Sequence, residues 1–165
     1  IFGASGGVAE AAVRTAYEFA TGEQLKDVDI KPLRGTSNRS RDIELDLKGT
    51  KLVVRVVSTL VEAEKSLKEI KEGKAPFQLL EVMACPGGCI NGGGQPRSCD
   101  DSKIKGERAQ GLYKEDSELP LRKSHMNPSI QKLYQEYLEH PNSHKAHELL
   151  HTVYNDKFTG SYKDI

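Results

Sequence analysis

The chain has 165 residues, enough for one domain with its own core, and its 24 basic and 24 acidic residues cancel at neutral pH. This balance, without a long block of like charge, argues against binding to nucleic acid or to a membrane surface. The sequence shows no run of about 18 apolar residues and no signal peptide, so we expect no membrane insertion and no export. Three cysteines, an odd number, argue against a disulfide framework and fit thiols in a reducing, cytoplasmic compartment.

The N-terminal segment is predicted to form a glycine-rich turn followed by a helix that ends at Gly22. Apolar residues recur there at helical spacing, namely Val8, Ala12, Ala16 and Phe19. The turn allows two interpretations. A loop before a helix N-terminus is suited to approaching an anionic group, but tight turns into core helices are also common.

An α/β unit is predicted next. Residues 42–49 alternate apolar with charged side chains and residues 51–60 are rich in β-branched side chains, so these two segments are expected to form a hairpin. Residues 61–74 fit an amphipathic helix, and residues 76–84 fit a short apolar strand. Ligands of such α/β units lie beyond the carboxyl ends of the strands, which is where the next segment begins.

The sequence becomes polar and helical after residue 100. Asn127 and Pro128 indicate the start of a helix, and Pro141 indicates its end. Apolar residues are sparse here, so this tail is expected to wrap over a larger body rather than to form its own core. We therefore predict an α/β unit over residues 1–100 and a helical tail over residues 101–165.

Residues 81–96, EVMACPGGCINGGGQP, contain two cysteines among glycines and prolines. The CxxxC spacing of Cys85 and Cys89 is a weaker signal than CxxC, and the thiols could also be buried or free in a turn. Glycine lets the backbone approach a ligand closely, so a glycine-rich loop beside thiols points to a large group wrapped by main chain. An iron–sulfur cluster is such a group, and loop amides can donate to its sulfides.

Three stretches carry a resemblance to a known family: FGASGGVAEAAVRTAYE, the cysteine loop, and residues 107–154, from ERAQGLYKED to HELLHTVY. Together they resemble the C-terminal part of the iron-only (diiron, FeFe) hydrogenases, including the small-subunit-like tail. The resemblance covers nearly the whole chain. It implies an α/β fold that forms the C-terminal half of the H-cluster domain over residues 1–100, followed by the helical wrapping tail.

The resemblance implies a cofactor and a reaction. The H-cluster of this family is a 4Fe-4S cubane linked through one cysteine sulfur to a diiron site with carbonyl, cyanide and dithiolate ligands. By position, Cys85 matches a cubane ligand, and Cys89 matches the ligand that also bridges to the diiron site. The implied reaction is the reversible reduction of protons to dihydrogen, with cofactor chemistry supported by protein ligation and shielding.

Further residues are implied to surround the diiron site. Met83 matches a methionine that lines the diiron pocket, where a polarizable, dry side chain is suitable. The other matching residues are apolar ones that pack near the diiron ligands and glycines that allow close approach of the backbone: Phe2 and Val8, and Gly3, Gly6 and Gly7.

Departures from the family pattern limit what this chain is expected to do alone. The family's other two cluster cysteines lie in motifs of the TSCCPxW and MPCxxKxxE type, and neither motif occurs in these 165 residues. We therefore expect a partner, the remaining N-terminal part of a hydrogenase, and no activity without it. The first residue, Ile1, is not methionine and also suggests a fragment. Ala9 replaces the family's usual methionine, and Cys99 is interpreted as a free thiol.

The resemblance further implies ferredoxin or another electron carrier as a partner, in the cytoplasm of an anaerobic organism. A hydrogenase-like iron–sulfur protein that acts in sensing or in cluster handling, without hydrogen turnover, is the main alternative. Glu81, just before the loop, either orients a group near the cluster or is solvated or ion-paired.

A third hypothesis comes from HELLH, His147 to His151, which matches the H-E-x-x-H pattern of zinc metalloproteases with Glu148 as base. His140 and His144 extend the same helical face. A third protein ligand normally lies downstream, however, and only 14 residues follow His151. We favour structural or solvated histidines and expect Glu148→Gln to leave hydrogen chemistry largely intact.

Overall fold

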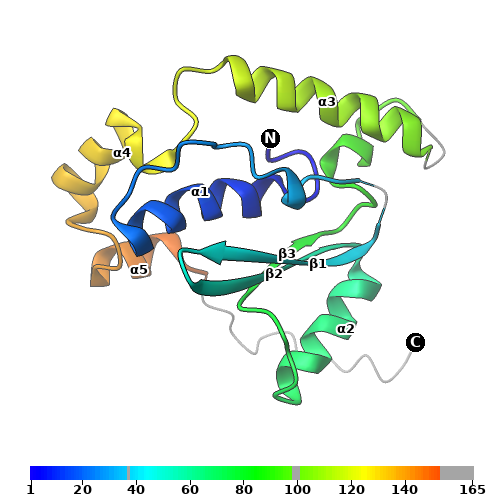
Figure 1. Cartoon of the computed structure of the whole chain (residues 1–165), viewed down its shortest axis with the longest axis horizontal. Helices are drawn as coiled ribbons and strands as arrows, with labels where there is room; N and C mark the ends of the chain where they lie inside the picture. Colours follow the sequence, from blue (N-terminus) through cyan, green and yellow to red (C-terminus); the bar gives the residue numbers. More distant parts are fainter. Residues whose placement is uncertain (37, 98–100, 153–165) are drawn as a thin grey trace. The chain divides into compact units, whose positions relative to one another are not determined.

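The computed structural model describes residues 1–36, 38–97 and 101–152, which belong to two compact units divided after Ser124 (Figure 1). Among the described residues, no helix is both long and apolar enough to cross a membrane. The first unit contains a sheet, three helices and two short 3₁₀ turns: α1 (Gly7–Thr21), η1 (Lys31–Leu33), β1 (Ser40–Leu47), β2 (Thr50–Ser58), α2 (Leu60–Lys71), β3 (Leu79–Met83), η2 (Cys89–Asn91) and α3 (Ser102–Glu118).

The sheet has the strand order β1-β2-β3, with β1 antiparallel and β3 parallel to β2. Lys48 and Gly49 connect β1 to β2, and both have positive φ, 53° and 90°, as a two-residue hairpin turn that matches the strand twist requires. The parallel pair is joined by α2. The predicted hairpin, helix and strand are therefore confirmed, and the fold is a mixed α/β fold.

The helices α1 and α2 lie on opposite faces of this sheet (Figure 1). On the α1 face, Val54 and Val56 of β2 are fully buried against Val13 of α1 and Leu33 of η1. Removing such a side chain from water stabilises the fold by about 1.5–3 kcal/mol. This cluster is the main hydrophobic core of the first unit, and it fixes α1 against the strands.

The face of α1 that enters the core differs from the prediction. Val8 and Phe19 of the predicted stripe are 44% and 68% exposed, and Ala12 and Ala16 are also exposed. The buried face is displaced around the helix and includes two charged residues: Ala9, Glu10, Val13 and Arg14. The charged pair can be buried because each partner finds further ion-pair partners outside the helix.

A charge network around Arg14 links α1 to α3. Arg14 donates to Glu10 at 2.7 Å and to Asp116 at 2.8 Å, while Arg34 also donates to Glu10 and Arg122 to Asp116. Burial by itself would raise the pKa of Asp116, but the hydrogen bonds from Arg14 and Arg122 outweigh it and lower the pKa to about 2. The network keeps Asp116 ionised and gives both Glu10 and Asp116 guanidinium partners.

Helix α3 also has an apolar contact with the rest of the first unit. Ala109 and Tyr113 of α3 pack in one buried cluster with Ala4 and Ile90, which belong to the N-terminal turn and to η2. Asp101 caps α3 by accepting from the Lys103 amide at 2.7 Å. The start of the predicted tail is thus packed against both loops that carry the candidate site.

The second unit, from residue 125, contains α4 (Pro128–Leu133), η4 (Tyr134–Leu138) and α5 (His144–Leu150). Helix α4 begins where predicted, with Asn127 accepting from the Ser129 amide at 2.9 Å and Pro128 in the first turn. The helical segment ends at Leu138, before Pro141. Ser143 caps α5 by accepting from the Ala146 amide.

Candidate functional site

The cysteine loop leaves the carboxyl end of β3, as the sequence predicts. Because β2 and β3 are parallel, their carboxyl ends lie at the same edge of the sheet, and the Thr59 amide after β2 donates to the Met83 carbonyl at 2.8 Å. The edge beyond parallel strand ends is where α/β folds bind their ligands. Cys85 and Cys89 follow directly at this edge.

Two loops from distant parts of the sequence are joined here. The Ser5 amide donates to the Gly87 carbonyl at 3.0 Å, and the Ile90 amide donates to the Gly3 carbonyl at 3.0 Å. Gly88, with φ 100°, lies so close that a Cβ would be 2.7 Å from the Gly3 oxygen and from the Ser5 nitrogen. A side chain at Gly88 would push the loops apart, so this glycine is needed for their contact.

Both thiols of the cysteine loop are free, with Cys85 partly buried and Cys89 exposed. A Cβ at Gly92 would lie 3.3 Å from the Cys85 sulfur, so glycine keeps the space beside that sulfur open. Two accessible sulfurs fit part of an iron–sulfur ligand set, for which thiolates are the usual protein donors. Within the described residues there is no group of three or more His, Cys, Asp or Glu side chains that could hold a metal ion. At this site the described part of the chain therefore offers these two thiols as metal ligands.

Several backbone amides of the cysteine loop are used within the protein. The Gly88, Asn91 and Gly92 amides donate to carbonyls of the loop itself, and the Ile90 amide donates to Gly3. These four amides are therefore not available to cluster sulfides. Only the other amides of the loop can donate to cluster sulfides, so the loop offers fewer donors than the sequence suggests.

The other predicted site residues are partly brought together. Val8 of α1 and Met83 of β3 line one groove of about 270 Å³, which runs between the helix and the free edge of the strand. Phe2 is 59% exposed at the start of the N-terminal loop. Apolar side chains thus lie uncovered beside the thiol loop.

The glycines of the N-terminal loop have structural contacts of their own. A Cβ at Gly6 would lie 1.8 Å from the Leu33 oxygen, and one at Gly7 would lie 2.0 Å from the Ile1 oxygen. At both positions the close approach is made to the protein's own backbone. Gly3 is less constrained, since a Cβ there would meet the Leu112 side chain at 3.1 Å.

Glu81 is the residue near the loop whose role the sequence left open. Its side chain is buried, with one oxygen accepting from the Gly6 amide at 2.6 Å and the other from the Ala9 amide at 2.7 Å. The anion at the N-terminus of α1 is therefore Glu81 itself, and the turn is a tight turn into a packed helix. The prediction of a solvated Glu81 is wrong, because the side chain is buried and both of its oxygens accept hydrogen bonds. The one hint in the sequence is a glutamate within an apolar strand, and its partners cannot be read from the sequence.

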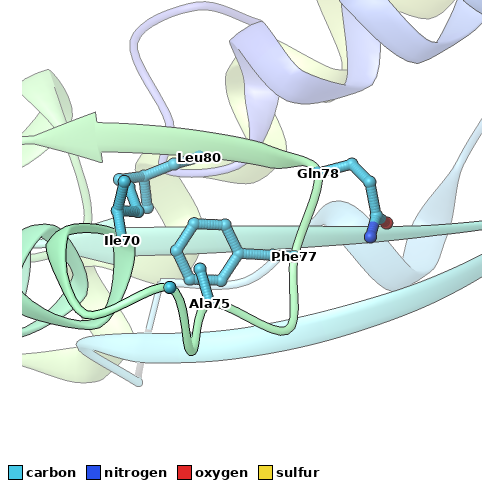
Figure 2. Close-up of a pocket in the computed structure, with 6 residues that line it drawn as sticks. Ile70, Ala75, Phe77, Gln78 and Leu80 are labelled. Carbon is cyan, nitrogen blue, oxygen red and sulfur yellow. The ribbon is translucent and has the colours of Figure 1, made fainter.

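A second pocket, of about 370 Å³, lies at the opposite end of β3. Ile70, Phe77 and Leu80 gather there, while the Gln78 side chain points away from them (Figure 2). The Arg55 guanidinium covers the Phe77 ring at 4.4 Å. The pocket is at the amino end of the strand, away from the cysteine loop.

The HELLH histidines lie on α5 and its C-cap. The rings of His147 and His151 are in contact, with centroids 4.5 Å apart and their Nδ1 atoms 3.3 Å apart. A protease zinc site needs a third protein ligand, and the described part of the chain contains no cluster of that size. The zinc hypothesis gains no support from the structure. Cys99, predicted to be a free thiol, lies outside the described residues.

Two family models match successive parts of the chain. The model described as "Iron only hydrogenase large subunit, C-terminal domain" matches residues 1–93, and "Iron hydrogenase small subunit" matches residues 102–157. The chain belongs to the iron-only hydrogenase family. The matches confirm the resemblance to the C-terminal part of this family that the sequence shows.

Known hydrogenases resemble the chain over nearly its whole length. The NADP-reducing hydrogenase subunit HndD of Solidesulfovibrio fructosivorans is 49% identical over 93% of this chain and 26% of that protein. Iron hydrogenase 1 of Clostridium pasteurianum is 40% identical over 93% of this chain and 27% of that protein. A solved variant of the FeFe-hydrogenase HydA1 from Chlamydomonas reinhardtii is 37% identical, with a TM-score of 0.67 over 93% of this chain and 45% of that one.

Proteins with other names are also similar to the chain. The cytosolic iron-sulfur assembly component 3 of Rattus norvegicus is 32% identical over 93% of this chain and 32% of that protein. The chain spans about a quarter to a third of the length of the curated relatives named here. Membership of the family therefore does not by itself decide between hydrogen turnover and another iron–sulfur function.

Proposed function

We propose that this chain supplies two of the four cubane cysteines of an H-cluster in a hydrogenase that reversibly reduces protons to dihydrogen. One observation carries the proposal. In a member of the iron-only hydrogenase family, a loop with two free thiols is bonded directly to the N-terminal loop that carries Phe2 and Gly3. Cys85 is assigned to the cubane, and Cys89, the more exposed thiol, to the bridge toward the diiron site.

The protein's part in this chemistry is ligation and shielding. When bound, the H-cluster would supply the redox chemistry that combines protons with electrons. Cys85 and Cys89 hold the cluster through their thiolates. Met83, Val8 and Phe2 are apolar side chains beside the loop. Val8 and Phe2 are exposed in this chain, and they would exclude water from the site once the remaining part of the protein covers them.

The remaining cluster cysteines are proposed to come from an N-terminal part of the same hydrogenase. Two thiols cannot complete the ligand set of a cubane, which takes four cysteines in the usual case. The apolar groove along the free edge of β3 and the exposed Val8 and Val82 offer a surface that such a part can cover. This chain alone is expected to be inactive.

Other features of the proposal follow from the family. Residues 1–100 are assigned to the C-terminal part of the H-cluster domain and residues 101–165 to the small-subunit-like tail, in line with the two family matches. Electrons are proposed to come from ferredoxin or another carrier. The proposed setting is the cytoplasm of an anaerobic organism.

The second candidate function is an iron–sulfur protein in sensing or in cluster handling, without hydrogen turnover. The 32% identity between this chain and an iron–sulfur assembly component supports this second candidate. The two candidates share the thiols of Cys85 and Cys89 but differ in the diiron part of the cofactor. Iron and sulfide without carbonyl and cyanide infrared bands, and without hydrogen evolution, would favour the second.

The test is Cys89→Ser in the complete protein, purified without oxygen, with Cys99→Ser as the matched control. Iron, acid-labile sulfide, infrared bands and hydrogen evolution are measured in each. We expect Cys89→Ser to lose cluster iron and activity because serine is a poor ligand for iron–sulfur clusters, and Cys99→Ser to keep both. Full iron content and activity in Cys89→Ser would overturn the proposal.

A further inference from the structure

Glu81 is a buried carboxylate at the point where the strand, the first helix and the cysteine loop meet. Its side chain leaves β3 two residues before Met83 and is only 8% exposed. It accepts from the amides of Gly6 and Ala9 at 2.6 and 2.7 Å, which span the first turn of α1. Both carboxylate oxygens are therefore used in holding a single helix end.

This arrangement replaces an ordinary helix cap. The N-cap residue of α1 is Gly6, which has no side chain with which to accept from the first-turn amides. A carboxylate from another element supplies both acceptors, and its charge is stabilised by the positive end of the helix dipole. Because a buried charge without partners is very costly, the contact fixes the strand and helix relative to each other.

The neighbouring contacts extend this fixation to the loop that carries Phe2. The Arg41 guanidinium donates to the Ser5 carbonyl at 2.9 Å and to the Leu33 carbonyl at 2.8 Å. Gly6 packs so closely against the Leu33 carbonyl that a Cβ there would lie 1.8 Å from the Leu33 oxygen. The N-terminal loop is thus clamped from the Arg41 side and from the Glu81 side.

The same strand delivers the cysteines. Three residues lie between Glu81 and Cys85, and the Ser5 amide donates to the carbonyl of Gly87, which lies between the two thiols. Loop and helix are therefore joined to this segment before, between and after the thiols: through the Glu81 carboxylate, through the Gly87 carbonyl, and through the Ile90 amide, which donates to Gly3. Loss of the first of these contacts would let Val8 move relative to Met83, which it faces across the groove.

We propose that Glu81 is a positioning residue for the cofactor site, and that it acts by capping α1 so that Phe2 and Val8 keep a fixed distance from Met83 and Cys85. The identity of the cofactor rests on the proposed function. The attachment of Glu81 to the start of α1 does not, because it is defined by the hydrogen bonds of Glu81 to the Gly6 and Ala9 amides.

The experiment compares Glu81→Gln with Glu44→Gln in the complete protein. Glutamine has nearly the same size as glutamate, but an NH₂ group replaces one of the two carboxylate oxygens, so a side-chain donor would face a backbone donor. Glu44 is the matched control because it lies on β1 of the same sheet, is exposed, and pairs with Lys51. Three quantities are measured: amide hydrogen exchange by peptide, iron content, and the positions of the carbonyl and cyanide infrared bands.

In Glu81→Gln we expect amides of residues 2–9 to exchange about tenfold faster, which corresponds to the loss of one buried hydrogen bond. The infrared bands are expected to shift or broaden at unchanged iron per folded protein, because the surroundings of the diiron ligands change. A purely structural role would lower the band intensity without moving the bands. Glu44→Gln is expected to match the wild type in every measurement.

Unchanged exchange and unchanged bands in Glu81→Gln would overturn the inference, as would faster exchange spread evenly over the chain. If Glu81→Gln does not accumulate, Glu81→Asp keeps both acceptor oxygens on a shorter stem and is expected to show the same localised change. A wild-type-like Glu81→Asp would then count against positioning. Failure of the proposed function is seen separately, as wild-type protein without iron, sulfide and infrared bands.

Discussion

The two sides of the α/β unit differ in how completely they are enclosed. On the side of η1 and α3, Arg14 and Asp116 are buried in a network of ion pairs beside the hydrophobic core. On the side of β3, the strand edge is unpaired in the described sheet, and Val8 and Val82 are each 44% exposed along an apolar groove. The enclosed side holds this chain together, whereas the open side leaves apolar surface for a further part of the protein.

The largest effect is expected from breaking the enclosed side. Arg14→Met leaves Glu10 and Asp116 each with one guanidinium partner fewer in a buried site, and we expect a loss of about 3–5 kcal/mol of unfolding free energy. Urea unfolding followed by circular dichroism measures this loss. A change below about 1 kcal/mol would mean that Arg34 and Arg122 suffice to stabilise the carboxylates.

Protonation of the same network at low pH is expected to have a smaller effect on the unfolding free energy. The folded-state pKa of Asp116 is about 2, below the ordinary 3.8, so its stabilising contribution is complete above pH 3.8 and is lost as the pH falls toward 2. The shift corresponds to about 2 kcal/mol. Urea unfolding at pH 6 and at pH 3 should show part of this loss in the wild type, and Asp116→Asn should lack that part. An equal loss in both would assign the pH dependence to other groups.

The smallest effect is expected on the open side, where it tests whether another part of the protein covers β3. Val82→Thr keeps the shape and strand propensity of the side chain, and in the complete protein we expect it to cost about 1 kcal/mol if the exposed half of Val82 becomes buried there. Lys65→Ala, which removes an exposed ion pair with Glu62, is the reference and should cost less than about 0.5 kcal/mol. Equal costs would indicate that the edge stays open.

Local patterns were sufficient for the elements themselves. The alternation before Gly49 and the β-branched run after it predict the hairpin, because both depend on neighbouring residues and on a turn that needs positive φ. Asn127 and Pro128 predict the start of α4 for the same reason. The cysteine loop could also be assigned to the end of a strand, since the apolar run before it is short and bounded.

The orientation of α1 could not be predicted from its own sequence. The stripe of Val8 and Phe19 has the right spacing for a core face, yet the structure buries Glu10 and Arg14 on a neighbouring face. The partners that make this burial acceptable, Arg34 and Asp116 among others, are 24 and 102 residues away from Glu10 and Arg14, respectively. Helical periodicity reports that a face exists, but long-range ion pairs decide which face is enclosed.

By itself, the sequence determined the family, the α/β succession of elements, and the loop with two thiols, because all of these depend on short motifs and local periodicity. Only the tertiary structure decided that the loop of Gly3 and Ser5 bonds to the loop of Gly87 and Ile90, and that Glu81 caps α1. The physical reason is that backbone amides and buried carboxylates choose partners by proximity in space. Glycines at positions such as Gly88 permit that proximity, but their sequence does not say which segment will approach.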